Sequence, residues 1–270
     1  MATDLTSTAG SESATATPAI SALPRAHRLR FGMIYGALGT VLVAAIIGLG
    51  IFATRSINPA PKWSAWKPTG GGQGAAHQIA DHVAQRYRLP NGDQLVDIIS
   101  KPPSLASGKS TLPIHFVAVR GVNKQPDQDY PVSSTNSVMY SLCGLGTSCA
   151  IASGKPSVER GRLVRREILE LALYTFKYVG GIQNVIAFMP ATAGKTPVQY
   201  VVFLRPSDVT AELKRPLATT LGNSVPQPKA IPAREVHAIE ATTGPRAYTL
   251  SGVAQAPQGD LVFVLAPRKT

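Results

Sequence analysis

An uncharged segment near the start of this 270-residue chain constrains its fold more than any other feature. Residues 31–54 form a run of 24 residues without a charged side chain, and a helix of about 20 apolar residues is long enough to span a bilayer. A secretory signal peptide is the alternative, but the run is too long for one, and no clear small-residue cleavage site follows Phe52. The sequence therefore predicts an uncleaved transmembrane helix, a signal-anchor, over residues 31–54.

The charges that flank this run predict its orientation. Arg25, Arg28 and Arg30 lie directly before it, whereas the basic residues that follow it are more widely spaced. Positive residues close to a membrane span favour the cytoplasmic side. We therefore predict a single-pass cell-membrane protein with a cytoplasmic N-terminus and an extracytoplasmic C-terminal domain. The alternative is a reversed topology with a cytosolic domain.

Composition divides the chain into four parts. Residues 1–30 form a tail that is rich in Ala, Ser and Thr, and we expect it to be disordered. The predicted membrane helix follows, and then a Pro- and Gly-rich linker over 55–75. Residues 76–270 are long enough to bury a core and are predicted to form the globular domain, with a possible internal boundary near 222–233.

Small residues recur at every fourth position of the predicted membrane helix. They are Gly32, Gly36, Thr40, Ala44 and Gly48. Residues at this spacing share one helix face, and small side chains let two membrane helices approach closely. The pattern predicts packing against a second copy or a partner membrane protein, although Gly and Ala are abundant throughout the chain.

The soluble part is predicted to be an α+β domain, with one long helix packed on a mixed, mostly antiparallel sheet. Apolar periodicity predicts helices over 75–89, 157–179 and 212–221. Strands are predicted over 95–100, 114–120, 137–143, 149–152, 185–189, 198–204, 236–239, 247–253 and 261–265. Two hairpins are expected, one between 137–143 and 149–152 and one between the last two strands.

The chain has two cysteines, Cys143 and Cys149, on either side of a Gly-rich turn. Outside the cytoplasm this spacing favours a structural disulfide. Free buried thiols and a redox or metal-handling pair are the alternatives. Redox pairs commonly have two residues between the cysteines, and this pair has five.

The soluble part is strongly basic. After Thr54 the chain has 24 basic and 13 acidic residues, a net charge of +11, which favours approach to anionic lipid or wall polymers. Nucleic acid is a less favoured partner, because no nucleic-acid-binding motif is present. Arg160, Arg162, Arg165 and Arg166 lie near the start of the long helix and are candidates for contact with an anionic partner. The alternative is a solvated face balanced by neighbouring glutamates.

The sequence contains no recognisable catalytic, cofactor-binding or metal-binding constellation. His77 and Asp81 are one helical turn apart, but a zinc site needs three or four ligands. The two Gly-Lys-Ser/Thr triplets at 108–110 and 194–196 lack the earlier glycine of a phosphate-binding loop. We therefore predict no cofactor and no metal, and we favour a non-enzymatic function.

Two segments carry a resemblance to a known family. Residues 142–151, with the Cys-Gly-Leu-Gly turn, and residues 156–174, with the Arg-Arg-Glu-Ile-Leu-Glu-Leu run, are similar to an uncharacterised family of bacterial single-pass membrane proteins. The resemblance covers the chain from Trp63 onward. It implies a membrane anchor and no particular activity.

The function favoured by these features is a non-enzymatic interaction or assembly module in the cell envelope. The first alternative is an envelope redox or metal-handling protein that uses Cys143 and Cys149. The second is a cytosolic nucleic-acid-binding domain in the reversed topology.

Overall fold

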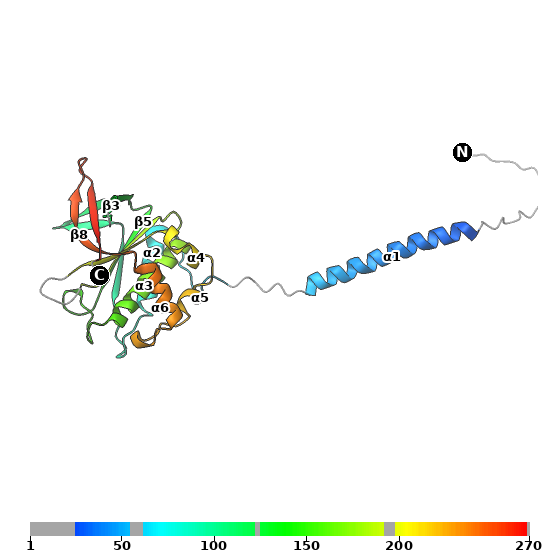
Figure 1. The fold of residues 1–270 in the computed structure, drawn as a ribbon, viewed down its shortest axis with the longest axis horizontal. Helices are drawn as coiled ribbons and strands as arrows, with labels where there is room; N and C mark the ends of the chain where they lie inside the picture. The colour runs from blue at the N-terminus through cyan, green and yellow to red at the C-terminus, as the bar shows by residue number, and fades with distance from the viewer. Residues whose placement is uncertain (1–24, 55–61, 122–124, 192–197, 269–270) are drawn as a thin grey trace, which may run out of the picture. The chain divides into compact units, whose positions relative to one another are not determined.

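The computed structural model describes residues 25–54, 62–121, 125–191 and 198–268, with side chains for 32–49 in the first range. The chain divides into two compact units, Met1–Pro59 and Ala60–Thr270. The relative placement of the two units is undetermined, so each is described by itself (Figure 1).

The first unit contains one helix, α1 (Arg25–Thr54). Within the described residues it is the one helix whose length and composition suffice to cross a membrane. The helix begins six residues before the predicted start at residue 31, so the three arginines predicted to lie in the tail belong to its first turns. The rest of the predicted tail, residues 1–24, and the start of the linker, 55–61, lie outside the described residues.

The second unit is built on one nine-stranded sheet with the order β1-β5-β6-β7-β8-β9-β3-β2, in which β4 also pairs with β3. The strands are β1 (Asp97–Lys101), β2 (Ser104–Ser107), β3 (Ser110–Val119), β4 (Gln128–Pro131), β5 (Ser137–Cys143), β6 (Asn184–Phe188), β7 (Tyr200–Leu204), β8 (Ala247–Gln255) and β9 (Leu261–Pro267). Six of the pairings between them are antiparallel and two are parallel. The predicted mixed, mostly antiparallel sheet is confirmed, and so is the terminal hairpin of β8 and β9.

Several helices cover one face of this sheet, whereas the prediction packed on it the long one of three expected helices (Figure 1). They are α2 (Gly72–Ala84), α3 (Val158–Tyr178), α4 (Thr210–Leu213), α5 (Leu217–Leu221) and α6 (Ala233–Thr243), with 3-10 turns η1 (Thr147–Cys149), η2 (Pro206–Val209) and η3 (Pro228–Ala230). The long helix α3 begins where the sequence predicts, because the hydroxyl oxygen of Ser157 accepts a 3.2 Å hydrogen bond from the N–H of Arg160. Its apolar residues form the main core together with α2, α6 and the sheet.

A second apolar cluster lies on the other face of the sheet. It contains Met139, Ile186, Phe203, Phe263 and Leu265 among others. Neighbouring residues of the same strands, such as those at 138 and 140, belong to the main core instead, because successive side chains of a strand point to opposite faces. The sheet curves into a nearly barrel-shaped arrangement, with this second cluster inside. The central strands β6 and β7 contribute to both apolar clusters and are therefore buried on both faces.

The predicted hairpin between 137–143 and 149–152 is wrong. Residues Thr147–Cys149 form the 3-10 turn η1, and residues 150–152, the rest of the second predicted strand, are not in a strand. Both edges of β5 are already paired, antiparallel to β1 and parallel to β6. The segment after the Gly-rich turn therefore has no free strand edge beside β5 to pair with.

Two further predictions are corrected in the C-terminal third. The strand predicted at 236–239 lies inside α6, whose buried residues Glu235, Ile239 and Thr243 recur at every fourth position. The helix predicted over 212–221 is divided into α4 and α5 around Pro216, since proline interrupts a helix interior.

Part of the predicted linker packs on the globular unit. The Trp63 ring lies edge-on to Tyr174 and Tyr178, each at 5.6 Å between centroids. The Trp63 carbonyl accepts a 2.7 Å hydrogen bond from the N–H of Leu217. The globular unit therefore includes residues before α2.

Candidate functional site

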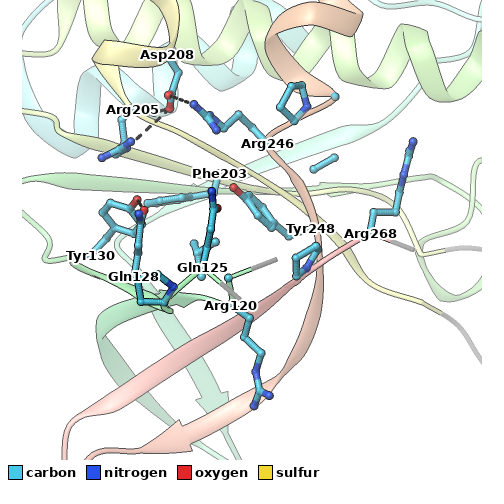
Figure 2. Close-up of a pocket in the computed structure, with 17 residues that line it drawn as sticks. Arg120, Gln125, Gln128, Tyr130, Phe203, Arg205, Asp208, Arg246, Tyr248 and Arg268 are labelled. Carbon is cyan, nitrogen blue, oxygen red and sulfur yellow. Dashed lines mark hydrogen bonds and ion pairs between the residues drawn. The ribbon is translucent and has the colours of Figure 1, made fainter. Parts of the chain in front are cut away.

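A cavity of about 470 Å³ opens at one end of the curved sheet (Figure 2). Four segments that are far apart in the sequence surround it: the end of β3 with the segment leading to β4, the end of β7 with η2, the turn between α6 and β8, and the residues after β9. Its described lining includes four arginines and one carboxylate: Arg120, Arg205, Arg246, Arg268 and Asp208. This excess of positive charge is what distinguishes the cavity.

Asp208 holds two of these arginines in place. Its Oδ1 lies 2.8 Å from Nη2 of Arg246, and its Oδ2 lies 3.9 Å from Nε of Arg205. The carboxylate also accepts a 2.9 Å hydrogen bond from the backbone N–H of Arg205, which fixes the turn from β7 into η2. The side chain of Asp208 is 6% exposed, so its charge is committed to these internal contacts.

The two arginines remain accessible from the cavity. The side chain of Arg205 is 36% exposed and that of Arg246 is 39% exposed. A guanidinium group carries five N–H donors, and Asp208 occupies only some of them. Two positive groups that share one negative group leave a net positive site with donors available for an anion.

Aromatic rings support the same end of the cavity. The guanidinium carbon of Arg205 lies 4.5 Å from the centroid of the Tyr130 ring, within the range of a cation–π contact. The Tyr130 ring in turn lies 5.2 Å from Phe203. Burial raises the pKa of Tyr248, and the nearby Arg246 opposes that rise. The Tyr248 hydroxyl is therefore protonated at neutral pH and can donate a hydrogen bond into the cavity.

Arg120 and Arg268 lie at the rim. Both are exposed, and in Figure 2 their side chains extend away from Asp208. Among the described residues, their guanidinium groups have no hydrogen-bond or ion-pair partner. These two side chains therefore add positive charge at the entrance without being committed to an internal contact.

The arginines named from the sequence make internal contacts. Nε of Arg162 lies 2.9 Å from Oε1 of Glu240. The two terminal nitrogens of Arg165 each lie 2.7 Å from a carboxylate oxygen of Glu240. Hydrogen bonds from Arg165, followed by those from Arg162 and opposed by partial burial, lower the pKa of Glu240 to about 2. Arg160 donates to the carbonyls of Lys155 and Ser153.

Arg166 is fully buried, although it belongs to the same segment. Its Nε donates a 2.7 Å hydrogen bond to Glu235, and its Nη1 lies 2.6 Å from the Tyr87 hydroxyl and 3.3 Å from Glu170. Its Nη2 donates to the carbonyl of Leu221. Arg166 therefore ties α3 to α6 and to the segment that follows α2. Contact of an anionic partner with Arg160, Arg162 and Arg165 stays a prediction.

The cysteine pair forms the expected bond: the sulfur atoms of Cys143 and Cys149 are 2.09 Å apart. The disulfide closes a tight loop between β5 and η1. Gly144 is required in this loop, because a side-chain carbon there would lie 2.1 Å from the carbonyl oxygen of Ala150. A redox role for the pair stays a prediction.

The lining of the cavity includes none of the other sequence candidates. Nε2 of His77 lies 3.7 Å from Oδ2 of Asp81 on the exposed face of α2. Within the described residues, no group of three or more potential metal ligands occurs. In α1, the Thr40 hydroxyl donates to the carbonyls of Gly36 and Ala37 at 3.1 and 2.8 Å. Packing of a second helix on the small-residue face stays a prediction.

None of the charged residues of the cavity was predicted as a site residue from the sequence. Each of the four arginines is 22 to 85 positions from the next one along the chain, and none lies in a recognisable motif. The one signal available was the excess of basic residues, which predicts an anionic partner but not its position.

Comparison with known proteins gives no assignment. No family model matches the sequence, and no curated protein or solved structure is significantly similar to it. The resemblance drawn from residues 142–151 and 156–174 stays a prediction. The function of the cavity has to be argued from its own residues.

Proposed function

We propose that this chain is a single-pass membrane protein whose globular domain is a non-enzymatic binding module for an anionic ligand, or for an anionic group of a partner. The observation that carries the proposal is the cavity in which Arg205 and Arg246 share the single carboxylate of Asp208 and remain partly exposed. Phosphate and carboxylate groups are the anions that fit paired guanidinium groups.

The arrangement favours binding over catalysis. The described lining contains no second carboxylate, histidine or cysteine beside Asp208 that would form an acid–base or nucleophilic pair. Asp208 itself is held by two guanidinium groups, so it serves to position them. Arg205 also packs against the Tyr130 ring. Its side chain is therefore already partly ordered, so less conformational entropy is lost when an anion binds.

The test measures the affinity of inorganic pyrophosphate by calorimetry. The full chain is studied in nanodiscs of zwitterionic lipid. An Arg205→Gln/Arg246→Gln double variant is expected to weaken binding by at least about tenfold, because charged hydrogen bonds contribute about 1.5–3 kcal/mol each. Binding should also weaken with added salt. Arg234→Gln, at an exposed arginine of α6 that lines neither this cavity nor another described one, is the matched control.

Folding of the double variant is checked by circular dichroism, since Asp208 loses both of its guanidinium partners in it. Arg120→Gln/Arg268→Gln provides a second variant that breaks no hydrogen bond or ion pair among the described residues, and a reduction of about threefold is expected from the loss of rim charge. Equal affinity in the original chain and in both folded double variants would show that the cavity is not the anion site.

The proposed location of the domain is extracytoplasmic, with α1 as the anchor and the N-terminus in the cytoplasm. The support is the length of α1 and the arginines in its first turns. The test labels intact cells with an impermeant maleimide, with and without an impermeant reductant. Labelling of Cys143 and Cys149 only after reduction is expected. Labelling by a permeant reagent alone, without reduction, would favour the reversed topology and a cytosolic partner.

The proposed role of α1 extends to helix association through Gly32, Gly36, Thr40, Ala44 and Gly48. Gly36→Leu/Gly48→Leu is expected to reduce the size of the complex measured in mild detergent, because bulky side chains keep helix backbones apart. Val43→Leu, at an exposed position outside this set, is the control. An unchanged size in the double Leu variant would exclude packing through this face.

A further inference from the structure

A second cavity, of about 630 Å³, adjoins the arginine-lined one. It lies between the disulfide loop, the first turns of α3 and the end of β6. Most of its lining is apolar, and the lining includes Ile151, Pro156, Val158, Val164, Met189 and Pro190. Its size falls in the range of about 300–1,000 Å³ that is usual for small-molecule sites.

Four charged side chains line this second cavity, and three of them, Arg160, Arg165 and Glu240, make contacts within the protein, whereas Arg268 has none among the described residues. Arg165 binds Glu240 through two hydrogen bonds of 2.7 Å, and Arg160 donates to backbone carbonyls. An occupant would therefore meet mainly aliphatic surface. Val158 is 68% exposed at the start of α3, and this otherwise unexplained apolar side chain forms part of that surface.

Two residues line both cavities, Ala247 and Arg268. Tyr248 pairs with Pro267 where β8 begins and β9 ends. Ala247 and Arg268 are the chain neighbours of this pair, so they lie at the same end of the two strands. Arg268 is exposed, and its guanidinium group has no partner among the described residues. The junction between the arginine-lined and apolar cavities therefore carries a free positive charge.

We propose that the two cavities together bind one anionic amphiphile, whose phosphate or carboxylate head lies at Arg246 and Arg268 and whose apolar chain occupies the second cavity. This inference rests on the proposed anion-binding function and adds the class of ligand. The physical reason is complementarity: one cavity supplies excess positive charge, the adjoining one supplies apolar surface to be buried, and a rim arginine joins them.

An acidic peptide fits the same place less well. A peptide backbone needs hydrogen-bond partners along its length, and strand addition to a sheet edge is the common way to supply them. The strands that reach the second cavity, β6, β7 and β8, are each paired on both sides. An alkyl chain has no such requirement.

The experiment compares inorganic phosphate, butyl phosphate, octyl phosphate and octanol, all as monomers, with the full chain in phosphatidylcholine nanodiscs and with empty nanodiscs. Octyl phosphate is expected to bind at least about tenfold more tightly than butyl phosphate, because more methylene groups are buried. Octanol should bind weakly for lack of charge. Octanoate in place of octyl phosphate tells a carboxylate head from a phosphate head.

Two variants assign the two halves of the site. Val158→Glu places a charge in the apolar cavity at an exposed first-turn position, where an acidic residue suits the helix. It is expected to abolish the advantage of octyl over butyl phosphate and to leave inorganic phosphate unchanged. Val253→Glu, at an exposed site of β8 outside both linings, is the matched control. Arg268→Gln is expected to weaken every phosphate ligand.

The outcomes separate this inference from the proposed function. If affinity is independent of chain length but still depends on Arg205 and Arg246, the anion site stands and the amphiphile inference is wrong. If neither the phosphate compounds nor octanoate binds, both fail. Tighter binding of a hexaglutamate peptide than of octyl phosphate would replace the amphiphile with an acidic peptide.

Discussion

Nε of Arg166 donates a 2.7 Å hydrogen bond to Oε2 of Glu235, which joins α3 to α6 through an ion pair inside the core. Arg166 has no exposed side-chain surface, and Glu235 has 5%. Tyr87 and Glu170 complete the environment of the guanidinium group. A buried charge of this kind depends on every partner, because little solvent is available to replace a lost one.

Removal of one partner of this pair should destabilise the domain strongly. Glu235→Gln is expected to lower the free energy of unfolding by about 3–5 kcal/mol, since it leaves the Arg166 charge incompletely balanced. The measurement is urea unfolding of the full chain followed by tryptophan fluorescence. Lys214→Gln, at an exposed position, is the control and should change stability by less than about 0.5 kcal/mol. A loss no larger than that of the control would mean that the ion pair contributes little.

Glu167 predicts a decrease of stability with rising pH. Neither of its carboxyl oxygens has a hydrogen-bond partner among the described residues. Burial, reinforced by the charge of Glu170 and opposed by Arg166, raises its pKa well above 4.5. The folded state therefore holds this proton more tightly than the unfolded state does. Stability should fall as the pH rises above about 4.5, by at most about 1.4 kcal/mol per pH unit from this group.

Glu167→Gln tests this prediction because it removes the titration and nearly keeps the shape. The stability of the variant relative to the original chain is expected to increase between about pH 5 and pH 8. Urea unfolding at a series of pH values gives the comparison. A constant difference across that interval would mean that Glu167 does not change its protonation on unfolding.

Glu240 predicts the opposite dependence at low pH. Its pKa is lowered to about 2, chiefly by hydrogen bonds from Arg165. A lowered folded-state pKa contributes stability above the ordinary value of 4.5, and this contribution is lost as the pH falls toward 2. The side chain is 40% exposed, so solvent screening limits the effect to about 1 kcal/mol.

The matched comparison is Glu240→Gln, studied by urea unfolding from about pH 6 down to about pH 2. The variant should be less stable than the original chain at the upper end and equal to it at the lower end. If the difference persists unchanged at the lower end, the contribution of Glu240 does not come from its charge.

Two glycine substitutions should have opposite signs. Gly144→Ala brings a side-chain carbon to 2.1 Å from the Ala150 carbonyl oxygen and must displace the disulfide loop, with an expected loss of about 1–3 kcal/mol. Gly161→Ala meets no atom within 4 Å and lies inside α3, so it should stabilise by about 0.5–1 kcal/mol. Thermal unfolding of the two variants measures both, and equal effects would contradict the close approach at Gly144.

The sequence by itself determined the features that depend on local pattern. The uncharged run predicts the apolar helix α1, the cap at Ser157 and its apolar periodicity predict α3, and the spacing of Cys143 and Cys149 predicts their bond. Each is specified within a short stretch of chain, where helical period, capping and loop length can be recognised directly. The same local reasoning failed for the strand predicted at 236–239, because a short apolar run fits a helix or a strand equally well until its neighbours are known.

Only the tertiary structure decided the candidate anion-binding surface. Sheet order brings Arg120, Arg205, Arg246 and Arg268 to one end of the curved sheet. The packing of α6 on α3 places Glu235 and Glu240 beside α3, so that Arg165 and Arg166 make internal ion pairs. Neighbours across a sheet and between packed helices are set by pairings between distant segments, which periodicity along a single segment does not encode. The sequence determined that the domain is basic, and the fold decided which arginines are enclosed and which remain available to bind an anion.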